Sequence, residues 1–196
     1  AKQLPLLIVN AGSFQLIEGS PLQRRQFLDW MVFHVKPEFA SLWKGLQKTL
    51  KQRNSLLRRD KITYSDIQPW DVEFCRLANA IDDAREAVFS QFIATFAGLE
   101  KAFLDEGLEV EMEYVRGWDQ QQDISNILTA SFDRDARDGY THFGPQRAEI
   151  KIRAKQKMAA DVLSRGQEKA LICAMTVAQA QLYKANLGKD SVFLID

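Results

Sequence analysis

The residues best suited to chemistry are Ser164, Arg165, Gly166 and Gln167, at the start of a long amphipathic stretch. If a helix begins there, its unpaired N–H groups and the positive end of its dipole favour a bound anion. Gly166 lets the backbone approach a phosphate closely, while Ser164 adds a hydroxyl donor and Arg165 a positive charge. The pattern predicts a phosphate-binding turn; the simpler alternative is Ser164 as an ordinary N-cap.

A second candidate follows the amphipathic stretch, where apolar Val192–Ile195 leads directly into Asp196. A carboxylate in this position can hold Mg²⁺ through water, as the Walker B residue of an ATPase does, although Asp is also a common turn residue. A Ser-x-Gly-Gln turn, a helix and an apolar strand ending in Asp together resemble the trailing half of an ABC-type ATPase head. No Gly-x-x-x-x-Gly-Lys-Ser/Thr string occurs in the 196 residues, so we expect the isolated chain neither to bind ATP tightly nor to hydrolyse it.

Two arginines, Arg24 and Arg25, follow a helix start at Ser20-Pro21. Cations are unfavourable in the first turn of a helix unless something anionic or structural holds them. A phosphate is one such partner, and Asp29, four residues after Arg25, is another. Solvated arginines are the alternative.

Long helices must position these residues. Apolar spacing predicts a helix over 21–35, a second over 38–60 and a third that opens at Pro69 and runs for some thirty residues. The last two form an antiparallel hairpin, or arm. Beside the apolar stripe of the second helix we expect an exposed basic face, which binds nucleic acid or is merely solvated; it comprises Lys44, Lys48, Lys51, Arg53, Arg58 and Arg59.

The remaining segments mix strands and helices. Alternating or apolar runs predict strands at 4–9, 109–115 and 148–154 and a buried strand at 192–195, with helices at 124–138 and 164–186 between them. The predicted class is α+β, mainly helical, with a long helical hairpin attached to the trailing part of an ABC-type head. We expect a head strand and loop at 1–20, the arm at 21–107 and the head portion at 108–196.

Composition narrows the function class. With 46% hydrophobic and 27% charged residues the chain suits a folded globular protein, and it has no run long enough to span a membrane. Residues 1–65 carry a balance of +7, residues 66–125 of −10 and residues 126–196 of +3. This segregation either creates a basic face or is neutralised within the fold. Cys75 and Cys173 lie among apolar residues, as buried thiols do in a reducing cytoplasm.

These strings together resemble the RecF family of bacterial recombinational-repair ATPases, which is related to SMC-type heads. The similarity covers nearly the whole chain in the family's order. It departs at Gln146-Arg147-Ala148-Glu149, where the family more often has His-Arg-Asp-Asp. The matching strings are Gly19-Ser20-Pro21-x-x-Arg24-Arg25-x-Phe27-Leu28-Asp29-Trp30, Leu50-Lys51-Gln52-Arg53-Asn54-Ser55-Leu56-Leu57, Gly144-Pro145-x-Arg147, Leu163-Ser164-Arg165-Gly166-Gln167 and Phe193-Leu194-Ile195-Asp196.

The resemblance implies a middle segment of a weak DNA-dependent ATPase that binds ATP and Mg²⁺ and dimerises with ATP. Ser164, Arg165, Gly166 and Gln167 would then act on the other subunit's nucleotide, and Asp196 on the metal of its own. It also implies binding to single-stranded or gapped DNA, and loading of recombinase with RecO and RecR in DNA repair, replication and the SOS response. Charge alone suggests Arg24, Arg25, Lys48, Lys51, Arg53, Arg58 and Arg59 as DNA contacts. The alternative is a helical scaffold from another SMC-like head protein that does not bind DNA.

Overall fold

The computed structural model describes residues 6–195, which form two compact units. The first unit comprises residues up to 35, 85–114 and 150 onward; the second comprises 36–84 and 115–149. The predicted arm, 21–107, therefore includes segments of both units. The chain is mainly helical with a few strands, so the predicted fold class is confirmed.

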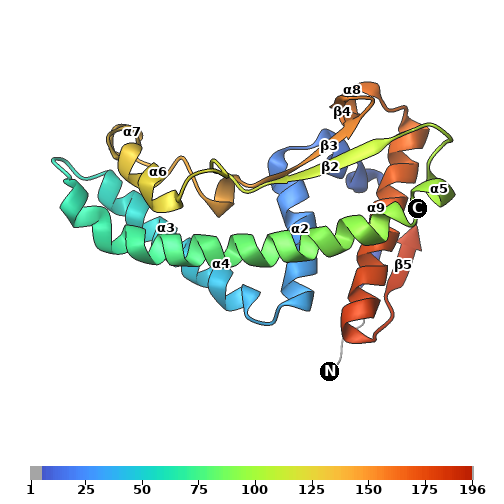
Figure 1. The fold of residues 1–196 in the computed structure, drawn as a ribbon, viewed down its shortest axis with the longest axis horizontal. Helices are drawn as coiled ribbons and strands as arrows, with labels where there is room; N and C mark the ends of the chain where they lie inside the picture. The colour runs from blue at the N-terminus through green and yellow to red at the C-terminus, as the bar shows by residue number, and fades with distance from the viewer. Residues whose placement is uncertain (1–5, 196) are drawn as a thin grey trace. The chain divides into compact units, whose positions relative to one another are not determined.

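The first unit contains two small sheets and several helices (Figure 1). Strands β1 (Leu6–Val9) and β5 (Val192–Ile195) pair in parallel, with Ile8 opposite Leu194. The second sheet has the order β2 (Val110–Val115), β3 (Glu149–Ala154) and β4 (Lys157–Met158). The helical elements of this unit are η1 (Ala11–Phe14), α1 (Gln15–Glu18), α2 (Pro21–Val35), the part of α4 (Tyr64–Ala97) from residue 85 on, α5 (Glu100–Phe103), α8 (Ala159–Val162) and α9 (Arg165–Leu187).

The strand β5 is not buried, contrary to prediction. Val192 is 45% exposed and Leu194 is 54% exposed. Ile8, on the partner strand, is 50% exposed. Leu7 and Val9, which alternate with Ile8, are buried, and α9 contacts this strand. Within the described residues this sheet has only two strands, and the apolar side chains of Ile8, Val192 and Leu194 remain about half exposed.

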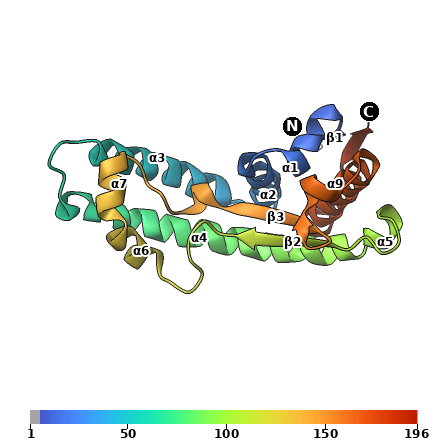
Figure 2. The same ribbon diagram turned by 90° about the horizontal axis from the view of Figure 1, so that it is seen from above.

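The second unit is built on α3 (Phe39–Leu57) and the first part of α4 (Tyr64–Ala97). The two helices lie side by side in Figures 1 and 2, and Gly45 on α3 faces Leu77 of α4. Two short helices, α6 (Ile124–Ala130) and α7 (Phe132–Asp138), and the turn η2 (Pro145–Arg147) complete the unit. The predicted antiparallel hairpin is thus present in this unit.

Two helix boundaries differ from the prediction. Helix α4 begins at Tyr64, not at Pro69, because Asp66 accepts hydrogen bonds from the backbone and hydroxyl of Thr63 and caps the first turn. These bonds lower the pKa of Asp66. The helix predicted at 124–138 is divided at Ser131, whose hydroxyl donates to the Leu128 carbonyl and competes with the helical bonding pattern.

Candidate functional site

The Ser164 turn forms the start of α9, as the sequence predicts. The Ser164 hydroxyl accepts from the Gln167 N–H at 3.3 Å, and the Gln167 side-chain oxygen accepts from the Ser164 N–H at 3.0 Å. This reciprocal capping box makes Ser164 a true N-cap. The simpler alternative is therefore correct for the Ser164 side chain, and it is compatible with an anion at the remaining N–H groups of the turn.

Gly166 faces open space. A Cβ atom built on Gly166 meets no neighbouring heavy atom within 4 Å, so internal packing does not require glycine at this position. A glycine also weakens a helix relative to alanine. The glycine leaves the backbone of the first turn of α9 accessible to an outside group.

Three acidic side chains hold the other members of the turn. Arg165 pairs through Nη1 with Glu18 Oε1 at 2.7 Å and with Glu168 Oε2 at 3.2 Å, while the Gln167 amide donates to Asp105 Oδ2 at 3.0 Å. Asp105 and Gln167 line a cavity of about 210 Å³ together with Ser164 and Gly166. Sequence reasoning identified neither Glu18 nor Asp105, because each is far from the turn along the chain.

Arg24 is buried, and this makes it unsuitable as a direct DNA contact. Its Nη1 donates to the carbonyls of Ile17 and Gly19, at 3.3 and 2.8 Å, and so fixes the bend before α2. Gly19 is required there, since a Cβ would lie 2.2 Å from the Gln15 carbonyl oxygen. A structural contact rather than an anion therefore holds Arg24. Asp29, the carboxylate proposed as a partner, accepts two hydrogen bonds from Arg85. Arg25 is half-buried.

The predicted basic face of α3 is present in the second unit, with one correction. Lys44, Lys48 and Lys51 are exposed on α3, and Arg58 and Arg59 are exposed just after it. Arg53 was wrongly assigned to this face and is fully buried. Helix geometry accounts for the difference, because position 53 follows the stripe of Leu46, Leu50 and Leu57 at three- and four-residue spacing.

Arg53 is the centre of a buried polar cluster in the second unit. Its Nε donates to Asp71 at 2.6 Å, and its Nη1 donates to Asp135 and to the Thr141 hydroxyl, both at 2.7 Å. Burial raises the pKa of Asp71, outweighing the attraction of Arg53. Arg53 thus joins α3, α4, α7 and the segment after α7, which is a structural role.

His142 completes this cluster. Its Nδ1 lies 2.7 Å from Asp135 Oδ1, and its backbone N–H donates to the same oxygen at 3.2 Å. The sequence alone does not indicate this partner, because Asp135 comes to lie beside His142 only when α7 has formed.

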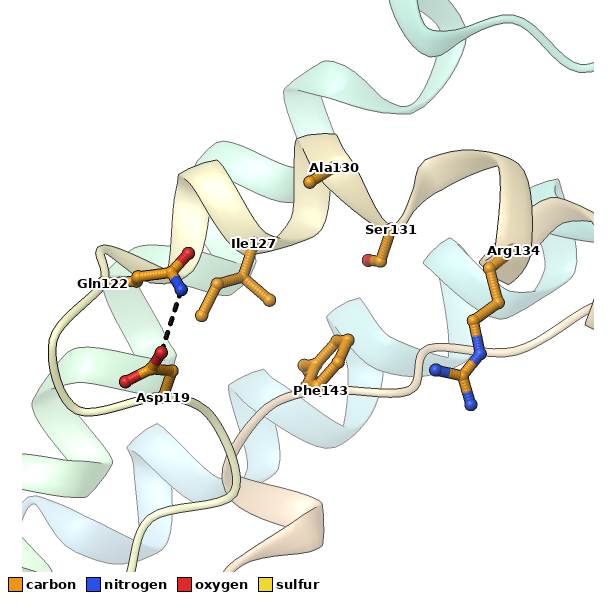
Figure 3. Close-up of a pocket in the computed structure, with 7 residues that line it drawn as sticks. All are labelled: Asp119, Gln122, Ile127, Ala130, Ser131, Arg134 and Phe143. Atoms are coloured by element: carbon orange, nitrogen blue, oxygen red, sulfur yellow. Dashed lines mark hydrogen bonds between the residues drawn. The ribbon is translucent and has the colours of Figure 1, made fainter.

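Figure 3 shows a cavity of about 350 Å³ in the second unit, beside α6 and α7. Ile127, Ala130 and Phe143 form its apolar walls, and Arg134 lies at one side. At the other side Asp119 accepts from the Gln121 N–H and the Gln122 amide, and these bonds lower the pKa of Asp119. None of the predicted site residues lines this cavity.

The remaining predictions concern metals and membranes. Asp196, the predicted magnesium carboxylate, lies outside the described residues. Within residues 6–195, no three His, Cys, Asp or Glu side chains are grouped so that they could hold a metal ion. No helix in the same part of the chain has the length and apolar character that crossing a membrane requires.

The chain is similar to RecF proteins of several bacteria. The DNA replication and repair protein RecF of Cellvibrio japonicus is 44% identical over 194 residues, which are 98% of this chain and 53% of that protein. RecF of Saccharophagus degradans is 44% identical over the whole chain and 54% of its own length. The chain is homologous to about half of RecF. No protein-family profile matches it.

A solved structure gives the same result for the fold. The recombination mediator protein RecF with ATP, described as part of the RecFOR pathway, superimposes with a TM-score of 0.89. The superposition covers 98% of this chain and 54% of the solved one, at 19% sequence identity. The predicted resemblance to RecF and the predicted fold class are therefore confirmed. The chain spans about half the length of the RecF proteins that it matches.

Proposed function

We propose that residues Ser164–Gln167, here called the signature turn, belong to a RecF-like DNA repair ATPase. The turn would bind the γ-phosphate of an ATP that is held by a second copy of the protein. The observation that carries the proposal is the open start of α9, where the capped turn at Ser164 leaves Gly166 facing empty space. The 44% identity to RecF over this region supports it. So does the likeness of the fold to RecF with ATP. The Mg²⁺ of each nucleotide would be held by Asp196 of the copy that binds that nucleotide.

The test uses a full-length RecF protein that carries these 196 residues. Ser164→Arg places a bulky side chain on the turn and should abolish ATP-dependent dimers in analytical ultracentrifugation. The same variant should bind ATP as the parent does, because the proposed turn acts on the nucleotide of the second copy and not on that of its own chain. Ser164→Thr keeps an N-capping hydroxyl and is the matched control. ATP-dependent dimers of normal affinity from Ser164→Arg would refute the role in trans.

We further propose that the exposed basic residues of the second unit bind the phosphate backbone of single-stranded or gapped DNA. Lys48, Lys51, Arg58 and Arg59 are the candidates, and their exposure supports the proposal. Arg58 also donates to the Gly139 carbonyl at 3.2 Å, which leaves the rest of its guanidinium for a phosphate. By resemblance, this DNA-bound protein would work with RecO and RecR in loading recombinase.

Salt dependence distinguishes this DNA role from a scaffold role. Each lost phosphate contact lowers the slope of log K against log[salt] by about 0.7–0.9. Replacing all four candidates with alanine should therefore reduce the slope by roughly 3 units. The control replaces Lys155 and Lys157, two exposed lysines of the first unit, and should leave the slope nearly unchanged. Equal salt-dependence slopes for the parent and for the variant with all four substitutions would favour the scaffold role.

A further inference from the structure

The segment before α2 makes a contact with the signature turn that the proposed function does not use. Phe14 and Glu18 stand four residues apart at the two ends of α1, so their side chains lie on one side of this short helix. The guanidinium of Arg165 lies over the Phe14 ring at 4.7 Å and pairs with Glu18 at 2.7 Å. Arg165 is thus held by a ring on its face and by a carboxylate at one nitrogen.

This arrangement fixes the direction of the arginine. Both carboxylate contacts, to Glu18 and to Glu168, use Nη1. A guanidinium is planar and offers five N–H donors in a rigid fork, so holding Nη1 and the ring face sets where Nε and Nη2 point. The side chain remains 67% exposed, which leaves that edge accessible to a phosphate from outside.

The support behind Glu18 is rigid. Ile17 is buried, and Arg24 binds the carbonyls on both sides of Glu18, those of Ile17 and Gly19. A charged group that is buried and bonded to two carbonyls does not move easily, because it would leave unsatisfied donors behind. Gly19 and Arg24 belong to the matching string that begins at Gly19, and Glu18 directly precedes it, so the start of this string has a structural role beside the turn.

We propose that Phe14 and Glu18 are positioning residues, which direct Arg165 toward the phosphate of the partner's nucleotide. Arg24 holds the backbone on either side of Glu18. The inference rests on the proposed function of the signature turn. It goes beyond that function in assigning roles to three residues outside the turn. Preorganised donors of this kind stabilise charge without having to reorient when the ligand arrives.

A double-mutant cycle tests the proposal in the full-length protein, with Glu18→Ala, Arg165→Ala and the two combined. Glu18→Ala should weaken ATP-dependent dimerisation roughly fivefold or more, and should have almost no effect once Arg165 is alanine. Glu18→Gln keeps an oxygen that can accept from Arg165 and should restore part of the loss. Phe14→Leu, which keeps the apolar bulk but removes the ring face, should cause a smaller loss that also depends on Arg165.

The outcomes separate this inference from the function on which it rests. Effects of Glu18→Ala that simply add to those of Arg165→Ala would overturn the positioning role. Tighter dimerisation of Glu18→Ala would also overturn it, because Glu18 would then be competing with the phosphate for Arg165. If instead the parent forms no ATP-dependent dimer, or Ser164→Arg dimerises normally, the proposed function itself fails. Thermal melts within about 2 °C of the parent would exclude misfolding of the exposed Glu18 variants.

Discussion

Replacing Gly166 with alanine should affect folding and function in opposite directions. Gly166 is the second residue of α9, and a Cβ there meets no neighbouring heavy atom within 4 Å. Alanine in a compatible backbone conformation stabilises a protein by about 0.4–1 kcal/mol, mainly by restricting the unfolded chain. The gain from helix propensity is smaller in the first turn than in the interior, so we expect about 0.5 kcal/mol. In a chain of this size that gain raises the melting temperature by about 1–2 °C.

The methyl group of Gly166→Ala should weaken ATP-dependent dimerisation of the full-length protein at least tenfold. It would occupy the space through which a phosphate would approach the backbone. Calorimetric melts measure the first effect and analytical ultracentrifugation with ATP measures the second. Gly188→Ala is the matched control: its Cβ also meets nothing, but its φ of +64° makes alanine unfavourable, so this variant should melt at a lower temperature. A lower melting temperature for Gly166→Ala, or dimers of normal affinity, would refute the reasoning.

Two further predictions concern the second unit. Arg53→Leu should destabilise the protein by about 3–5 kcal/mol in urea unfolding, because it leaves Asp71 and Asp135 buried without their cation. Lys51→Ala, on the exposed face of the same helix, should change stability by less than about 0.5 kcal/mol, and equal midpoints for the two variants would contradict the structural role of Arg53. Burial raises the pKa of the Cys75 thiol to about 11, so at pH 8 roughly one molecule in a thousand carries the reactive thiolate. Because this pKa is higher in the folded state, its stabilising contribution is complete below about pH 9 and is lost as the pH rises toward 11. Alkylation of Cys75, followed by mass spectrometry, should therefore be far slower in the native protein than in urea, and similar rates at pH 8 would show that the thiol is not protected.

Features encoded by neighbouring residues could be predicted from the sequence. The start of α9 was one, because a Ser and a Gln three positions apart are sufficient to form a capping box. Thr63 and Asp66 stand at the same spacing where α4 begins, whereas the predicted start is Pro69. Pro69 is tolerated inside α4.

Features that depend on distant residues could not be predicted. Nothing near Arg53 indicates that Asp71 and Asp135, 18 and 82 positions away, will surround it. The one local sign of its burial is its place in the apolar stripe of α3, and arginine is rarely buried without a partner. Glu18 and Asp105 illustrate the same limit at the signature turn, since each becomes a partner only when the fold brings it there.

The pairing of β1 with β5 bears on how the chain folds during synthesis. Residues 6–9 cannot find their partners until residues 192–195 have been made, so this sheet closes the longest loop in the described chain. Closing such a loop is entropically costly and slow compared with forming local helices. The second unit is complete in sequence once residue 149 has left the ribosome, whereas β1 must wait for some forty residues more. Until then its apolar side chains lack their partner strand, and a chaperone that shields residues 6–9 would hold the first unit open without delaying the second.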